Sequence, residues 1–358
     1  MQRCGLVFFL SLIFACNHRS KNIMVVWKDQ TAIGISIPEE LVHHSSDAIK
    51  DNSIEISIQG AAHSTAMLGS YSKNNHTVIF DAAVPLMPGL TYVVKQNGTP
   101  LGTVQVPFAK NEERPKLVNI YPLADTLPEN QLKLYLEFSK PMHRGQSLDY
   151  VKIIGSRGDT LKNVFLDLQP ELWDTTGRIL TLWLDPGRIK RGLVLNQKFG
   201  NPLKRAQVYK LTVSSDWKDN RGMKLLKHYD KQFVAGERQE KAPDINSWEV
   251  GSPKAGSVTP LNIRFPNPMD HYLLRECIQI LDSQNKPVKG HITTLDNDKI
   301  WQFVPANLWR AQTYTLTVSA RLEDLAGNNL NRVFDRDIRK DKTQRNEQFY
   351  KRVFRVLP

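Results

Sequence analysis

Residues 132–138, LKLYLEF, decide the fold class because apolar and polar side chains alternate along them. In an extended strand the leucines and the phenylalanine would face one side, and Lys133 and Glu137 would face the other. The same period of two recurs at residues 33–37 (IGISI) and 54–58 (IEISI). Many such short runs are separated by Pro, Gly, Asn and Asp, and the sequence lacks long amphipathic helical stretches. These patterns predict an all-β protein made of half-buried antiparallel strands.

Two motifs occur twice in the same order and indicate two copies of one domain. FSKPMH at residues 138–143 recurs as FPNPMD at residues 265–270, and YKLTVS at 209–214 recurs as YTLTVS at 314–319. From the first Phe to the Tyr there are 71 residues in the first copy and 49 in the second, so the first copy is 22 residues longer. Much of this excess follows Asp185. A repeat of this kind predicts tandem domains.

Each copy places a tyrosine at the start of a late strand, shortly after a leucine and a tight turn. Tyr209 and Tyr314 occupy this position, and Tyr92 in PGLTYVV indicates a third, shorter match near the N-terminus. This is the setting of a tyrosine corner, in which the hydroxyl bonds back to the backbone. An Asp-x-x-Gly turn then follows at residues 219–222 and 324–327, where the carboxylate would cap the turn and the glycine would adopt positive φ.

Together these motifs resemble the bacterial Ig-like domain of the S-layer type. The resemblance rests on Phe-x-x-Pro-Met, on FVP at residues 303–305, on the segment 308–314 and on DLAGN at 324–328, and it covers residues 115–333. It implies a seven-stranded sandwich that occurs in tandem on exported bacterial proteins as a spacer, adhesive unit or stalk. The expected fold is therefore all-β, with tandem Ig-like antiparallel β-sandwich domains, and the expected role is that of a non-catalytic scaffold.

Polar, proline-bearing stretches mark the expected domain boundaries. The expected segments are a signal peptide (1–15), an N-terminal β-sandwich (16–110), an Ig-like domain with a basic insertion (115–235), a second Ig-like domain (243–333) and a basic C-terminal segment (334–358).

The first residues have the pattern of an export signal. Arg3 precedes an apolar stretch at residues 5–15, which is too short to span a bilayer as a helix but fits a secretory signal. Residues 12–16, LIFAC, resemble the lipobox of bacterial lipoproteins, although Phe14 stands where that motif usually has a small residue. The resemblance implies a lipid on Cys16 that anchors the protein to a membrane. The alternative is an ordinary cleaved signal with a chance cysteine.

The expected location is the bacterial cell envelope. No acidic run follows Cys16, which favours an anchor that faces the periplasm.

The sequence shows no catalytic or cofactor-binding pattern. It lacks a Gly-x-Ser-x-Gly elbow, a phosphate loop, His-Glu-x-x-His and paired Cys-x-x-Cys. The adjacent histidines at 43–44 would point to opposite faces of a strand, and Cys277 fits a buried, inert thiol. Asp324 and Asn328, with Asp219 as their counterpart, could bind calcium through oxygen atoms, but one Asp per loop is sparse for calcium and fits turn capping better. We therefore expect no enzyme activity, metal or cofactor.

Positive charge is the most distinctive binding feature. The formal net charge is +12, and residues 186–210 carry seven Lys or Arg and no acidic residue. A basic face attracts anionic surfaces, and export excludes nucleic acid as the partner. The candidate binding residues are the cations Arg188, Lys190 and Arg191 and the nearby aromatics Trp173, Trp183 and Trp217.

Two functional hypotheses follow from these observations. The first is a structural or interaction scaffold whose partner is another envelope protein; the second is a module that binds a glycan or an anionic cell-wall polymer. Tryptophans exposed beside Arg188 and Lys190 would favour the second, because aromatic faces stack on sugars and cations. If the tryptophans are buried and the cations only keep a long loop soluble, the scaffold hypothesis is favoured instead.

Overall fold

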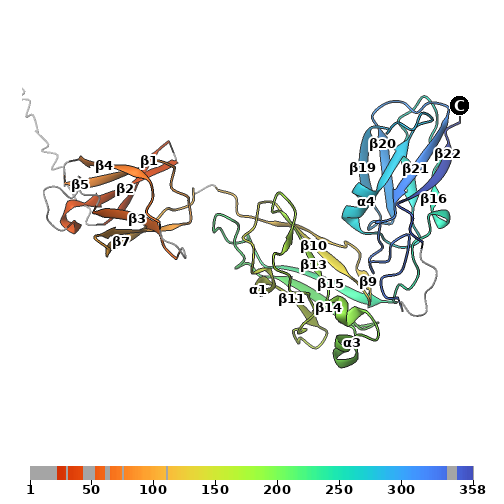
Figure 1. Cartoon of the computed structure of the whole chain (residues 1–358), viewed down its shortest axis with the longest axis horizontal. Helices are drawn as coiled ribbons and strands as arrows, with labels where there is room; N and C mark the ends of the chain where they lie inside the picture. The colour runs from red at the N-terminus through yellow and green to blue at the C-terminus, as the bar shows by residue number, and fades with distance from the viewer. Residues whose placement is uncertain are drawn as a thin grey trace, which may run out of the picture. The chain divides into compact units, whose positions relative to one another are not determined.

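The computed structural model describes residues 22–29, 31–42, 53–60, 65–74, 76–109, 112–336 and 345–357. The chain divides into two compact units, Met1–Glu113 and Arg114–Pro358. Antiparallel sheets dominate both units, so the predicted all-β fold is confirmed (Figure 1). The predicted signal peptide, Cys16 and the histidines at 43–44 lie outside the described residues.

The described residues of the first unit form a β-sandwich with strand orders β1-β2-β5-β4 and β3-β6-β7. Its elements are β1 (Met24–Lys28), β2 (Thr31–Pro38), the 3-10 turn η1 (Glu39–Leu41), β3 (Ile54–Ile58), β4 (Gly69–Asn74), β5 (Thr77–Ala82), β6 (Thr91–Gln96) and β7 (Thr99–Gln105). Ile35, Ile37, Ile56 and Phe80 are fully buried between the two sheets. The alternation predicted for this part of the chain is therefore present.

The second unit contains two sandwiches. The first of them, the middle sandwich, has strand orders β12-β13-β10-β8 and β11-β14-β15-β9, and only β9 runs parallel to its neighbour β15. Its elements are β8 (Leu117–Tyr121), β9 (Thr126–Pro128), β10 (Lys133–Phe138), α1 (Ser147–Tyr150), β11 (Val151–Gly155), β12 (Leu172–Trp173), β13 (Ile179–Trp183), α2 (Pro186–Ile189), α3 (Val194–Phe199), β14 (Val208–Val213) and β15 (Tyr229–Gly236).

The last sandwich has strand orders β16-β17-β20-β19 and β18-β21-β22. Its elements are the 3-10 turn η2 (Ile245–Ser247), β16 (Glu249–Val250), β17 (Leu261–Arg264), α4 (His271–Cys277), β18 (Ile278–Leu281), β19 (Gly290–Leu295), β20 (Ile300–Pro305), β21 (Thr313–Ser319) and β22 (Phe349–Arg355).

The last sandwich extends beyond residue 333, where the sequence analysis ended it. Strand β22 pairs antiparallel with the whole of β21, from Thr313 opposite Arg355 to Ser319 opposite Phe349. Phe354 is buried in the core of this sandwich. Residues 349–356, expected in a separate basic segment, therefore belong to this sandwich. The basic residues of this segment mask the apolar alternation that marks a strand.

The additional residues of the middle sandwich lie where the repeat spacing placed them. Residues 184–207, here called the insertion, connect β13 to β14 and contain α2 and α3. The equivalent connection in the last sandwich, between β20 and β21, is residues 306–312. Among the described residues, none of the helices is long and apolar enough to cross a membrane.

The repeated motifs contact one another in the same way in both sandwiches of the second unit. Met142 of the first Pro-Met motif forms an antiparallel bridge with Asp219 of its Asp-x-x-Gly turn. Met269 and Asp324 form the equivalent bridge. The two motifs therefore recur together because the end of one strand pairs with the turn.

Tyrosine corners are present in all three sandwiches. The hydroxyl oxygens of Tyr92, Tyr209 and Tyr314 each accept a hydrogen bond from a backbone N–H four or five residues earlier, at 2.9, 2.8 and 3.1 Å. Each bond fixes the loop that precedes the strand. The predicted third copy of the motif at Tyr92 is thus confirmed.

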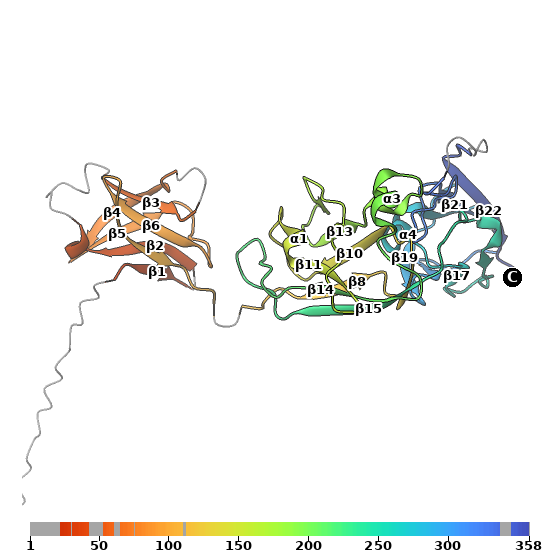
Figure 2. The ribbon, with the colours of Figure 1, turned by 90° about the horizontal axis from the view of Figure 1, so that it is seen from below.

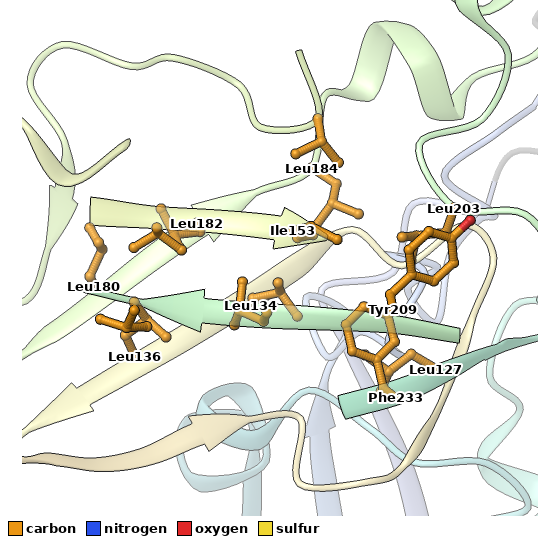
Figure 3. Packing of buried hydrophobic residues seen from close by; sticks show 14 of the residues in the cluster. Leu127, Leu134, Leu136, Ile153, Leu180, Leu182, Leu184, Leu203, Tyr209 and Phe233 are labelled. Atoms are coloured by element: carbon orange, nitrogen blue, oxygen red, sulfur yellow. The ribbon is translucent and has the colours of Figure 1, made fainter. Parts of the chain in front are cut away.

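Leucines on one face of β10 and β13 fill the middle sandwich (Figure 3). Leu134 and Leu136 of β10 pair in register with Leu182 and Leu180 of β13. These side chains pack in one cluster with Ile153 and other residues of the opposite sheet. Residues 132–138 are therefore the core strand that their alternation predicted.

Candidate functional site

Arg188 is buried at the end of α2 and is bonded inside the protein. Its guanidinium group donates to five backbone carbonyl oxygens, which matches the five N–H donors that the group possesses. The acceptors belong to Lys162, Asn163, Phe199, Gly200 and Asn201, at 3.1, 3.1, 3.5, 3.2 and 3.2 Å. Arg188 therefore ties the end of α3 to the connection between β11 and β12, and all its donors are used by these contacts.

Lys190 and Arg191 face the last sandwich. The ammonium nitrogen of Lys190 lies 4.3 Å from the ring centroid of Phe334, and Nε of Arg191 donates to Oδ2 of Asp335 at 2.8 Å. Arg238, in the segment between the sandwiches, donates to the same oxygen at 2.5 Å. Two of the three predicted cations thus take part in contacts between the two sandwiches.

The three predicted tryptophans belong to the middle sandwich and differ in their surroundings. Trp217 is fully buried and stacks on Tyr150, with ring centroids 5.5 Å apart. Trp173 is half-buried, and its indole N–H donates to Glu171 at 2.8 Å. Trp183, also half-buried, lies under the ammonium of Lys133 at 5.4 Å. This geometry favours the scaffold over a sugar-stacking platform, and ligand binding by these residues stays a prediction.

A polar network joins the two sandwiches and was not predicted from the sequence. The Tyr135 hydroxyl donates to Oδ2 of Asp270 at 2.6 Å. Nζ of Lys133 lies 2.6 Å from a carboxylate oxygen of Glu323 and 3.7 Å from Asp270. Asp270 also caps α4 by accepting the backbone N–H of Leu273 at 3.1 Å. We call the contact between the middle and last sandwiches the junction.

Aromatic rings extend the junction beside this network. The ring of Tyr121 stacks on His271 with centroids 3.7 Å apart, and Tyr272 meets the ring of Tyr135 edge-on at 4.9 Å. Nδ1 of His271 lies 2.8 Å from Oδ1 of the buried Asp298. Burial raises the pKa of Tyr121 to about 12, and the nearby carboxylate of Glu137 acts in the same direction.

The Asp-x-x-Gly turn of the last sandwich also lies in the junction. The backbone N–H of Leu132 donates to the carbonyl oxygen of Leu325 at 2.9 Å, and Leu325 packs into the core of the middle sandwich. Gly327 has φ of +78°, and a Cβ there would lie 2.2 Å from Cδ2 of Leu132. A larger residue here would therefore have to adopt a strained positive φ and displace the buried side chain of Leu132, the residue before β10.

Burial dominates the electrostatics of this turn. It raises the pKa of the Asp324 carboxyl to about 7, against the opposing effect of hydrogen bonds from Asn328 and from backbone N–H groups. Burial also raises the pKa of Glu323, although the ammonium of Lys133 acts in the opposite direction. Lys133 is the cation beside both the Glu323 and the Asp270 carboxylates, so the network depends on that lysine.

One sequence signal pointed to the junction. Tyr135 lies on the predicted polar side of residues 132–138, between Lys133 and Glu137, yet it is buried. A large aromatic residue on the polar face of a strand indicates a second packed surface. The partner residues, which lie about 135 positions away for the Tyr135–Asp270 bond, carried no signal of their own.

The described residues hold no group of three or more His, Cys, Asp or Glu placed to bind a metal ion. Oδ1 of Asp219 and Oδ1 of Asp324 each accept two backbone N–H groups of their own turn, as the capping interpretation predicted. Cys277 is buried at the end of α4, where desolvation raises the pKa of its thiol.

Comparison with known proteins connects the last sandwich to a sequence family. The family described as bacterial Ig-like domain matches residues 239–336. A search of curated proteins found no match.

Solved structures resemble the chain with low sequence identity. They include the N-terminal part of the bacterial S-layer protein SbsC (10% identity, TM-score 0.25, 58% of this chain and 40% of that one) and domains MG0-NIE-MG1 of native alpha-2-macroglobulin from Escherichia coli (12%, 0.23, 58% and 66%). Three Ig domains of titin match at 8% identity with a TM-score of 0.19, over 85% of this chain and 87% of that one. The chain thus spans less than two thirds of the first two proteins.

The chain is therefore an all-β protein of several sandwiches, and its residues 239–336 match the bacterial Ig-like family.

Proposed function

We propose that this protein is a non-catalytic lipoprotein of the bacterial envelope, in which the two sandwiches of the second unit form one stiff arm. The single observation that carries the scaffold role is the junction. A flexible chain of domains would leave its linkers solvated, whereas here Tyr135, Asp270 and Leu325 are buried between sandwiches. Opening the junction would break these hydrogen bonds and expose packed apolar and aromatic surface to water, and both changes oppose bending.

Stiffness can be measured with spin labels at Lys152→Cys and Lys289→Cys, two exposed positions on different sandwiches. Cys277 is buried and should not react, and Cys16→Ser removes the other cysteine of the mature chain. We expect a narrow distance distribution that Lys133→Met broadens. A broad distribution in the parent chain would contradict a stiff arm.

The lipid anchor is proposed from residues 1–16, with the periplasm as the compartment that the anchored chain faces. The bacterial Ig-like match of residues 239–336 supports an envelope location but does not bear on the lipid. The test is Cys16→Ser followed by cell fractionation. We expect the parent chain to fractionate with membranes and the variant to appear in the soluble periplasmic fraction. Retention of the variant on membranes would exclude the anchor as the means of attachment.

A second proposal is binding of a glycan or anionic cell-wall polymer. A groove of about 510 Å³ beside the insertion supports it, because Arg157 and Lys204 line the groove together with Phe199. The test is retention of the Cys16→Ser chain on purified cell wall and on lipopolysaccharide at low salt and at about 0.5 M salt, where charge pairing is screened. If high salt abolishes retention, and the double variant Arg157→Glu with Lys204→Glu abolishes it too, the polymer binds in this groove. No retention would leave a scaffold whose partner is another protein.

A further inference from the structure

The insertion carries an apolar patch on its surface. Leu193, Val194, Leu195 and Phe199, here called the α3 tip, have exposed fractions of 45, 75, 41 and 46%. Single exposed apolar residues are ordinary, but four within seven positions concentrate apolar surface on this short segment. The tip belongs to α3, which lies at the rim of the second unit in both views (Figures 1 and 2).

Internal bonds hold the tip in place. Arg188 binds the carbonyl oxygens of Phe199 and of the two residues that follow it. The side-chain amide of Asn196 donates to Oδ1 of Asn201 at 3.0 Å, which closes the turn after α3. Since the backbone beneath the tip is fixed by buried hydrogen bonds, exposure of these apolar side chains is a property of the fold.

The charged side chains that the tip segment itself supplies are all cations, although Asp159 of another segment lines the groove beside Phe199 and Lys204. Residues 186–210 contain no acidic residue. Lys198 and Lys204 are exposed and, among the described residues, form no ion pair with a carboxylate. Nζ of Lys198 lies 5.2 Å from the ring centroid of Phe199, so the cation sits directly beside the apolar patch.

We propose that the α3 tip docks on an anionic lipid surface, with its apolar side chains in the headgroup layer and Lys198 and Lys204 on lipid phosphates. Apolar residues flanked by cations are what interfacial membrane binding requires. A soluble glycan would leave the aliphatic side chains exposed, and a second copy of the tip would repel the first by its charge. The proposal places a membrane contact beyond the lipid anchor of the proposed function and does not depend on Cys16.

The test uses the mature chain with Cys16→Ser, so that no lipid is attached. Binding is measured by co-sedimentation with vesicles of phosphatidylglycerol and phosphatidylcholine in equal parts, and with vesicles of phosphatidylcholine alone. We expect binding to the anionic vesicles only. Lys198→Gln with Lys204→Gln should weaken it on the order of fivefold for each lysine neutralised, and Leu193→Ser with Val194→Ser should weaken it about tenfold or more.

Matched controls lie on the last sandwich. Lys286→Gln with Lys289→Gln removes two exposed lysines, and Val353→Ser removes an apolar side chain that is 64% exposed on β22. Neither should change binding. A polarity-sensitive dye on Val194→Cys should shift to the blue with anionic vesicles, while the same dye on Val353→Cys should not.

Three results would overturn the proposal: no binding to anionic vesicles, equal loss in the controls, or retention on cell-wall polymer without binding to vesicles. None of these bears on the anchor, because Cys16 is absent from the chain tested. Unchanged thermal unfolding of each variant shows that loss of binding is not loss of fold.

Discussion

Replacing Lys133 by Met should open the junction. The substitution keeps most of the unbranched side chain and removes the ammonium group, which lies 2.6 Å from Glu323 and 3.7 Å from Asp270. The Lys133 and Asp270 side chains are 14% and 5% exposed, so little solvent replaces the lost ammonium. Two carboxylates would then share a buried site without a cation.

The expected magnitude follows from these distances. With an effective dielectric constant of about 20, the two attractions amount to about 6 and 4 kcal/mol before desolvation. Desolvation of the lysine offsets several kcal/mol of this sum. Removing one partner of a buried pair typically lowers stability by about 3–5 kcal/mol, and we expect a value near the lower end because Glu323 is 22% exposed.

The pH dependence has a defined sign. Burial already raises the pKa of Glu323, and loss of the Lys133 ammonium would raise it further. The folded variant would then hold a proton that the unfolded chain has released, so its stability falls as pH rises through the folded pKa. Lys133→Met should therefore be more destabilising at pH 8 than at pH 5.

The assay combines urea unfolding with hydrogen exchange of the Leu132 amide, which donates across the junction to Leu325. Adding Glu323→Gln should recover part of the loss. The same change at Lys210, whose pair with Asp230 is 45% and 40% exposed, should lower stability by less than about 1 kcal/mol. A loss below that value in Lys133→Met, with unchanged Leu132 exchange, would refute the role assigned to the network.

Three further predictions concern the turns and corners. Asp324→Asn should flatten the pH dependence of stability. Because burial raises the folded pKa of Asp324 to about 7, the protonated carboxyl contributes stability at low pH that is lost as pH rises, on the order of 2 kcal/mol between pH 5 and 7. Equal pH slopes for parent and variant in urea unfolding would contradict this. Gly327→Ala should lower stability by about 2–4 kcal/mol in the same assay, because the residue has positive φ and its Cβ would overlap Leu132. The control Gly256→Ala, with positive φ in open space, should lower stability by about 1–2 kcal/mol. Equal losses in the two variants would show that the overlap with Leu132 costs nothing. Tyr209→Phe removes the corner hydrogen bond of 2.8 Å and should shift the urea midpoint by the equivalent of about 1 kcal/mol; an unchanged midpoint would show that the corner adds nothing.

The local architecture was predictable because its determinants are close in sequence or repeated. Alternation in residues 132–138 identified a core strand, and a tyrosine a few residues after a turn identified a corner in each sandwich. The Asp-x-x-Gly turns were predicted as capped turns, since an Asp side chain reaches only its neighbouring N–H groups. The excess spacing between the repeated motifs also located the insertion.

The tertiary structure alone decided what these elements contact over long distances. Arg188 looked like a free surface cation, but the insertion folds its own carbonyl oxygens around the guanidinium. The turn at Asp324 looked local, yet its Leu325 bonds to Leu132, directly before β10, and forms part of the junction. Strand β22 was not predicted because basic residues obscure its apolar alternation, and only its pairing with β21 identifies it. In each case the contacting residues are far apart in sequence, and they meet because of how the chain folds. Neither the hydrophobic period nor the local spacing of residues specifies such long-range contacts.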